Sequence, residues 1–196
     1  RIRNYLIGFE ELGLDTTEVE QHFTEFLDQD TVERVKTSLG KEIDNPFDFF
    51  DAVYCINQDL QTDRWQVMEK QFAMLGIFFR VIRFSAVESD NDIDARYTLS
   101  HRAIVAEAQN LDYENILVFE DDALFYGDAL ELVQNAVSEL QNQKWQVFYL
   151  GVANDEQVHK KLEGCQYLSH PADLTCTHAI AYHSCAYEKI LTDVPA

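Results

Sequence analysis

The chain has 196 residues, of which 46% are hydrophobic and 12% aromatic. This composition suits one globular domain with a real core and excludes intrinsic disorder. The 35 acidic residues against 15 Lys and Arg give a net charge of −20, which repels nucleic acid and anionic membranes, so neither is an expected partner. No apolar run reaches the length of a transmembrane segment. The four cysteines form no CxxC pair and are interpreted as reduced thiols of a cytoplasmic protein.

Residues 1–45 are expected to form a helical extension. Two capping-box patterns each precede an apolar helical stripe in this region, and Gly40 ends the second stripe. Asn45-Pro46 marks the connection to the main domain, which we assign to residues 46–196. The chain does not begin with Met, and it is interpreted as a piece of a longer protein or a renumbered one.

The main domain alternates strand patterns with helix patterns, which predicts an α/β fold with a mainly parallel sheet. Its first unit is a strand at 51–57, a helix capped by Thr62 or Asp63 and ended by Gly76, and a strand at 79–84. The helix is predicted to face the core with an apolar stripe of Trp65, Met68, Phe72 and Leu75. The later elements are a helix from Ser100 to Asn110, a strand ending in Glu120-Asp121-Asp122, a helix opened by Asp128 and Glu131, strands at 145–150 and 177–182, and a helix at 186–191.

The most informative stretch is 115–125, where four apolar residues run directly into Glu120, Asp121 and Asp122. The apolar run predicts a strand buried on both faces, and ligands of open α/β sheets bind at the carboxyl ends of such strands. With an extended backbone, Glu120 and Asp122 point to one side and Asp121 to the other. Two carboxylates on one side form a platform for a divalent cation, which would also let this acidic chain accept an anionic nucleotide-sugar. A solvated acidic turn is the alternative interpretation, and the apolar run before the acids favours a site.

The chain lacks the common sequence motifs of nucleotide-binding and acyl-transfer enzymes. GxGxxG, Walker A and GxSxG are all absent, so Rossmann dehydrogenases, P-loop enzymes and α/β-hydrolases are not expected. An α/β sheet with acids and histidines suits metal-assisted chemistry on a phosphorylated donor. A structural zinc site is a minor alternative, because the late histidines and cysteines lack the close ligand pairs of such sites. These residues are His159, Cys165, His170, Cys176, His178, His183 and Cys185.

Five segments within residues 51–192 together resemble glycosyltransferase family 25, which includes lipooligosaccharide and procollagen sugar transferases. They are the strand at 53–57 with Asn57 and the following Arg64, Leu99-Ser100-His101, the apolar strand ending in Glu-Asp-Asp, the strand from Trp145 to Gly151, and the strand and helix from Thr177 to Leu191. The sequence departs from the family where Arg96-Tyr97 replaces Gly-Cys and Gln146 replaces Asp, which affects donor or sugar specificity. Family members also usually continue into acceptor-binding segments beyond the point at which this chain ends.

The resemblance implies a GT-A fold, which is a nucleotide-sugar-binding α/β sandwich with a metal at a DxD-like motif. By this resemblance, Mn²⁺ (or Mg²⁺) would be held by Asp122, Glu120 and His178. The donor-binding residues would be Asn57, Arg64, Ser100, His101, Glu120 and Asp121.

The resemblance also implies an inverting transfer in which a carboxylate deprotonates the acceptor hydroxyl. Asp155, Glu156 and Asp173 are alternative bases, and nothing in the sequence chooses among them. The leading hypothesis is a metal-dependent glycosyltransferase that moves a sugar from a UDP-sugar to a glycan acceptor. The alternatives are a degenerate transferase domain that acts as a binding or scaffolding module and a zinc-stabilised interaction domain.

Overall fold

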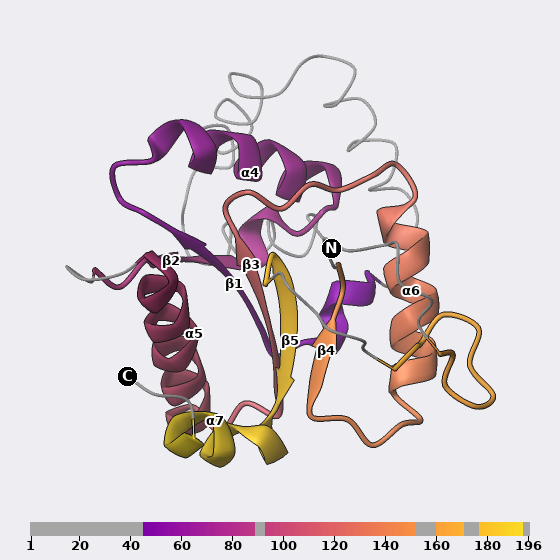
Figure 1. Ribbon diagram of the computed structural model, residues 1–196. Coiled ribbons are helices and arrows are strands. Elements are labelled where there is room, and N and C mark those ends of the chain that lie inside the picture. Colours follow the sequence, from indigo (N-terminus) through magenta and orange to yellow (C-terminus); the bar gives the residue numbers. More distant parts are fainter. Residues whose placement is uncertain (1–44, 89–92, 152–159, 171–176, 194–196) are drawn as a thin grey trace, which may run out of the picture.

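The computed structural model describes residues 45–88, 93–151, 160–170 and 177–193. The described residues form a five-stranded sheet covered by helices on both faces (Figure 1). The strands are β1 Ala52–Asn57, β2 Val81–Ser85, β3 Asn115–Glu120, β4 Val147–Tyr149 and β5 Ala179–His183. The α-helices are α4 Thr62–Met74, α5 Ile93–Asn110, α6 Ala129–Leu140 and α7 Tyr187–Asp193, with 3-10 turns at Pro46–Phe49, Phe78–Arg80 and Ser184–Ala186. The expected helical extension lies outside the described residues apart from Asn45.

The sheet has the strand order β2-β1-β3-β5-β4. β1 lies parallel to both β2 and β3, whereas β5 is antiparallel to both of its neighbours, β3 and β4. The sheet is therefore mixed: four of its strands run in one direction, as the predicted mainly parallel sheet required, and β5 runs against them. In the described residues no helix lies between β4 and β5, and an antiparallel pairing needs no helical crossover between its strands.

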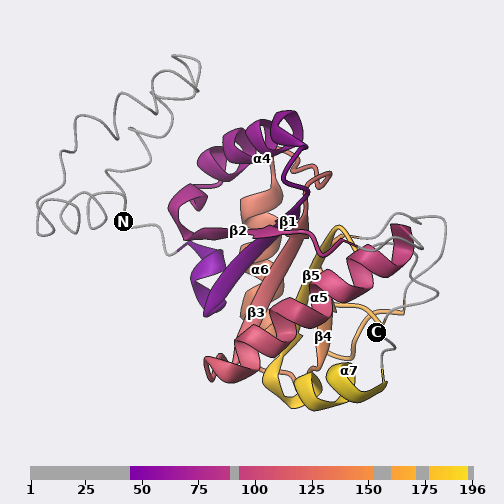
Figure 2. The ribbon, with the colours of Figure 1, turned by 90° about the vertical axis from the view of Figure 1, so that its left-hand side faces the viewer.

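Strand β3 separates two cores, because its side chains alternate between the two faces of the sheet. Leu117 and Phe119 pack with α4 and α6, whereas Ile116 and Val118 pack with α5 and α7. Figure 2 shows α5 and α7 on the near face of the sheet. Because both faces are covered, β3 is buried along its whole length, as the apolar run predicted.

Several predicted element ends were wrong. α5 begins at Ile93, so Ser100 lies inside the helix, where its hydroxyl donates to the Arg96 carbonyl at 2.7 Å. A serine hydroxyl can bond to the carbonyl four residues earlier as well as cap a helix, and the sequence does not distinguish the two. The second strand begins only at Val81, because a 3-10 turn occupies Phe78–Arg80.

The predicted side-chain caps of α4 and α6 are not observed either. α4 is preceded by Gln61 and α6 by Asp128, and neither side chain makes a capping hydrogen bond. The apolar stripe of α4 is confirmed, since Met68, Phe72 and Leu75 are all buried. Gly76 follows this helix with φ +70°, a conformation that glycine adopts without steric cost.

Among the described residues, no helix combines the length and apolar character needed to cross a bilayer.

Candidate metal centre

The turn after β3 is held in a defined position by α4. Gln71 spans the turn, because its amide group donates to the Ala123 carbonyl at 2.9 Å and its carbonyl oxygen accepts the Phe125 N–H at 3.0 Å. The Phe125 ring packs back on Phe119, with ring centroids 5.2 Å apart. The chain also turns through a hydrogen bond from Ala123 N–H to the Glu120 carbonyl at 3.1 Å. The acidic residues are therefore presented by a turn that is fixed at both ends.

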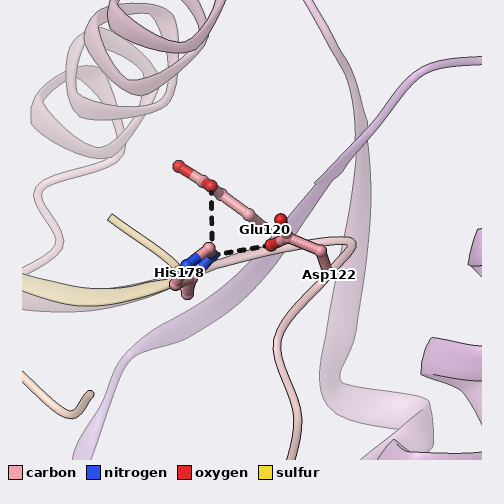
Figure 3. Close-up of side chains that lie close together, drawn as sticks. All are labelled: Glu120, Asp122 and His178. Atoms are coloured by element: carbon pink, nitrogen blue, oxygen red, sulfur yellow. Dashed lines mark hydrogen bonds and ion pairs between the residues drawn. The ribbon is translucent and has the colours of Figure 1, made fainter. Parts of the chain in front are cut away.

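The acids at the end of β3 point to two different sides, as the alternation predicted. Glu120 and Asp122 lie with His178, and the three side chains place one ligand atom each within 4.8 Å of one another (Figure 3). Asp121 points away from this group and contacts Asn57 and Arg64. The two acids that the sequence placed on one side are therefore together, and they are joined by a histidine from a distant segment.

His178 comes from the residue immediately before β5. Its backbone carbonyl accepts the Glu120 N–H at 3.0 Å, so the β3–β5 pairing places it beside the acids. Its Nδ1 atom lies 2.7 Å from Asp122 Oδ1 and 3.6 Å from Glu120 Oε2 (Figure 3). We refer to Glu120, Asp122 and His178 as the metal triad.

The metal triad has a donor set that suits a divalent cation. Two carboxylates favour Mg²⁺ or Mn²⁺, and an imidazole nitrogen is a common ligand of transition metals. Glu120 is buried, whereas Asp122 is exposed and His178 is partly exposed, so the group is open on one side to solvent. His178 would bind a cation in its neutral form, with a ring nitrogen released from its contact with Asp122.

A zinc site of the late cysteines is not supported by the part of the chain that is described. Cys165 and Cys185 are free thiols there, and no cluster of potential ligands in the same residues includes a cysteine. His159 and Cys176 lie outside the described residues.

The environment of Glu120 keeps its buried carboxylate charged. Burial on its own raises the pKa of this carboxyl, but interactions with His101, Thr177 and His178 outweigh burial and lower the pKa below its usual value. The Thr177 hydroxyl donates to Oε1, and His101 Nε2 lies 3.6 Å from the same oxygen. The family-like segment that contains Thr177 does not by itself predict this contact, because the contact depends on the β3–β5 pairing.

Asp121 forms a second polar group on the opposite side of the turn. Its two oxygens accept hydrogen bonds from the Asn57 amide at 2.7 Å and from the Arg64 guanidinium at 2.8 Å. The negative charge of the Asp121 carboxylate raises the pKa of the Arg64 guanidinium above its usual value. Arg83 Nε donates in turn to Asn57 Oδ1 at 3.0 Å, and its guanidinium lies over the Trp65 ring at 5.1 Å from the centroid. No local sequence pattern indicates Arg83, because its contact with Asn57 depends on the pairing of β1 with β2.

The remaining predicted residues fall into two groups. His101 lies beside Glu120, whereas the Ser100 hydroxyl is bonded to the Arg96 carbonyl and the Val87 N–H within the protein. The three alternative bases, Asp155, Glu156 and Asp173, lie outside the described residues, so the choice among them stays open.

Comparison with known protein families finds one family model that matches part of the chain. The family model for glycosyltransferase family 25, described as LPS biosynthesis protein, matches residues 98–190. We refer to the matched residues, 98–190, as the family 25 segment. The resemblance predicted from the five motifs is confirmed, and the match indicates a glycosyltransferase. None of the curated proteins that were compared with the chain matches it.

The family 25 segment contains the whole metal triad and His101. Asn57 and Arg64 lie before the matched residues, so their link to the site rests on their contacts with Asp121.

Proposed function

We propose that the protein is a metal-dependent glycosyltransferase that moves a sugar from a UDP-sugar to a hydroxyl of a glycan acceptor. The observation that carries this proposal is the metal triad, which stands at the carboxyl end of a central strand within the family 25 segment. The proposal includes a GT-A-like domain over residues 46–196, an inverting reaction and Mn²⁺ or Mg²⁺ as the cation. The cytoplasmic location stays a prediction.

The negative net charge of the chain is a reason for the protein to bind its donor through a cation. A net charge of −20 and three acids in a row repel a free diphosphate. A cation bound by the metal triad would offset the charge that develops on the departing diphosphate. In this proposal Glu120 and Asp122 supply the negative ligands, and His178 supplies a neutral one.

The Asp121 group would serve the donor from the other side of the turn. Asp121 ties Asn57 and Arg64 to the end of β3, and the Arg64 side chain remains 46% exposed. We propose that this guanidinium approaches the nucleotide part of the donor, since a planar cation matches phosphate oxygens well. Asp121 then acts through Asn57 and Arg64, because both of its oxygens accept hydrogen bonds from protein donors.

The test is calorimetric binding of UDP in Mn²⁺, in Mg²⁺ and in excess chelator. We expect binding only with a divalent cation, and loss of this binding in Asp122→Asn with little change in the metal-free melting temperature. Asp128→Asn is the matched control, because it removes one exposed negative charge a few residues away and outside the metal triad.

Equal UDP affinity in chelator would refute the metal dependence. Cation-dependent binding without UDP release from any UDP-sugar in the presence of simple glycoside acceptors would instead favour the degenerate binding module. If Asp122→Asn and Asp128→Asn weaken binding equally, the effect is one of overall charge, and the proposed site is wrong.

A further inference from the structure

We propose that His101, oriented by Tyr182, is a positioning residue that fixes the Glu120 carboxylate for metal binding. This inference rests on the proposed function, since it concerns how one ligand of the metal triad is held. It differs from the role that the family resemblance implied for His101, which was direct contact with the donor. His101 lies on α5, the helix before β3 in the chain, and Tyr182 lies on β5.

The buried imidazole of His101 is aimed at Glu120. His101 lies on α5 and is only 7% exposed, and its Nε2 atom has no hydrogen-bond partner within normal distance. Glu120 Oε1 lies 3.6 Å from this nitrogen. Leaving a buried polar nitrogen without a hydrogen-bond partner costs free energy of folding. The orientation of Nε2 toward the buried Glu120 carboxylate therefore indicates a role for this contact.

Tyr182 sets the orientation of the imidazole from the other end of the ring. Its hydroxyl lies 3.0 Å from His101 Nδ1, and the two rings meet edge to face at an interplanar angle of 72°. Tyr182 lies on β5 and is also buried. Because β5 follows His178 directly, residues 178–182 contain one residue of the metal triad and also Tyr182, which orients His101 beside Glu120.

The proton positions follow from the groups involved. A carboxylate only accepts hydrogen bonds, so the ring nitrogen that faces Glu120 is the one that carries a hydrogen. In a neutral imidazole with hydrogen on Nε2, His101 Nδ1 is the acceptor of the hydrogen bond that the Tyr182 hydroxyl donates, and we propose this arrangement for the 3.0 Å contact between them. At 3.6 Å the contact of Nε2 with Glu120 is longer than a hydrogen bond, and it acts as an electrostatic attraction in a buried setting.

As a consequence, the two carboxylate oxygens of Glu120 have different contacts. Oε1 accepts a hydrogen bond from the Thr177 hydroxyl and lies near His101, whereas Oε2 lies near His178. Oε2 is therefore the oxygen available to a cation shared with Asp122 and His178. Groups that hold a ligating carboxylate from behind typically change metal affinity about 10–100-fold when they are removed.

The test uses three variants of the full chain and measures Mn²⁺ affinity by electron paramagnetic resonance of the free ion, together with the metal-free melting temperature. We expect His101→Leu to weaken Mn²⁺ binding by about 10–100-fold, and Tyr182→Phe to weaken it in the same direction by less. His101→Gln, which keeps an N–H donor, should restore part of the affinity. Tyr187→Phe is the matched control, because it removes another buried hydroxyl from the same core, and this hydroxyl has no hydrogen-bond partner.

A spectroscopic measurement tests the arrangement without any metal. Nitrogen NMR of the imidazole should show the tautomer with hydrogen on Nε2, and Tyr182→Phe should disturb the His101 signal while Tyr187→Phe should not. Hydrogen on Nδ1 instead would overturn the inference, because His101 would then donate to Tyr182 and not face Glu120 with a proton.

The outcomes separate this inference from the proposed function. If wild type binds Mn²⁺ and Tyr182→Phe and His101→Leu lower only the melting temperature, the two residues are structural and the inference is wrong while the function stands. If wild type has no affinity for Mn²⁺, the proposed metal dependence fails, and with it any role of His101 toward a metal.

Discussion

Replacing Asp121 with alanine is expected to destabilise the protein far more than the same change at Asp122. Asp121 accepts hydrogen bonds from Asn57, which is 1% exposed, and from Arg64, which is about half exposed. Leaving a buried amide donor without its partner costs about 1–3 kcal/mol. The pair with the half-exposed Arg64 adds at most about 1 kcal/mol, because solvent screens it. We therefore expect a loss of about 1–4 kcal/mol from Asp121→Ala, compared with a typical total stability of about 5–15 kcal/mol.

Asp122→Ala is the matched comparison. Asp122 is exposed and contacts His178 at the surface, so its removal should cost less than about 1 kcal/mol. Both variants relieve repulsion within the same run of three acids, so this favourable contribution largely cancels when the two are compared. The expected difference in stability thus reports mainly on the contacts with Asn57 and Arg64.

Urea unfolding in the absence of metal measures both effects. The midpoint should fall clearly for Asp121→Ala and hardly for Asp122→Ala, with the dependence on urea unchanged in both. A double-mutant cycle with Arg64→Ala should show that only a minor part of the Asp121 loss comes from the ion pair. Equal losses for the two aspartates would refute the assignment of Asp121 to a structural network and of Asp122 to the open site.

Two further predictions concern other parts of the described chain. Phe119→Ala should cost about 3–5 kcal/mol in urea unfolding, because the Phe119 ring is fully buried among other aromatic rings, whereas Leu124→Ala, at a side chain that is 72% exposed, should have little effect. The Glu139 carboxylate accepts backbone N–H groups of residues 166–168, which outweigh the partial desolvation of the group and lower its pKa. The stabilisation by the Glu139 carboxylate should be complete above its unfolded-state pKa and lost as the pH falls through the lower folded-state pKa. Glu139→Gln should therefore speed amide exchange of residues 166–168 at neutral pH and much less in acid. A difference in exchange rate that does not depend on pH would contradict this prediction.

The sequence alone determined the features that depend on local periodicity. The apolar run before Glu120 identified a strand buried on both faces, and the two-residue alternation placed Glu120 and Asp122 opposite Asp121. The spacing of apolar residues identified the buried face of α4, and the order of short motifs identified the family. Each of these inferences uses residues that are neighbours in the chain or in one element.

Only the tertiary structure decided which distant residues join the acids. The antiparallel pairing of β5 with β3 brings His178 and Thr177 to Glu120, and the packing of α5 against the same face adds His101. Strand order and register are set by how whole faces pack, and local periodicity is the same for a parallel and an antiparallel neighbour. Ser100 is an example within a helix. A serine hydroxyl can cap the first turn of a helix or donate to the carbonyl four residues earlier, and the sequence is compatible with both. Because α5 begins at Ile93, Ser100 lies inside the helix and donates to the Arg96 carbonyl.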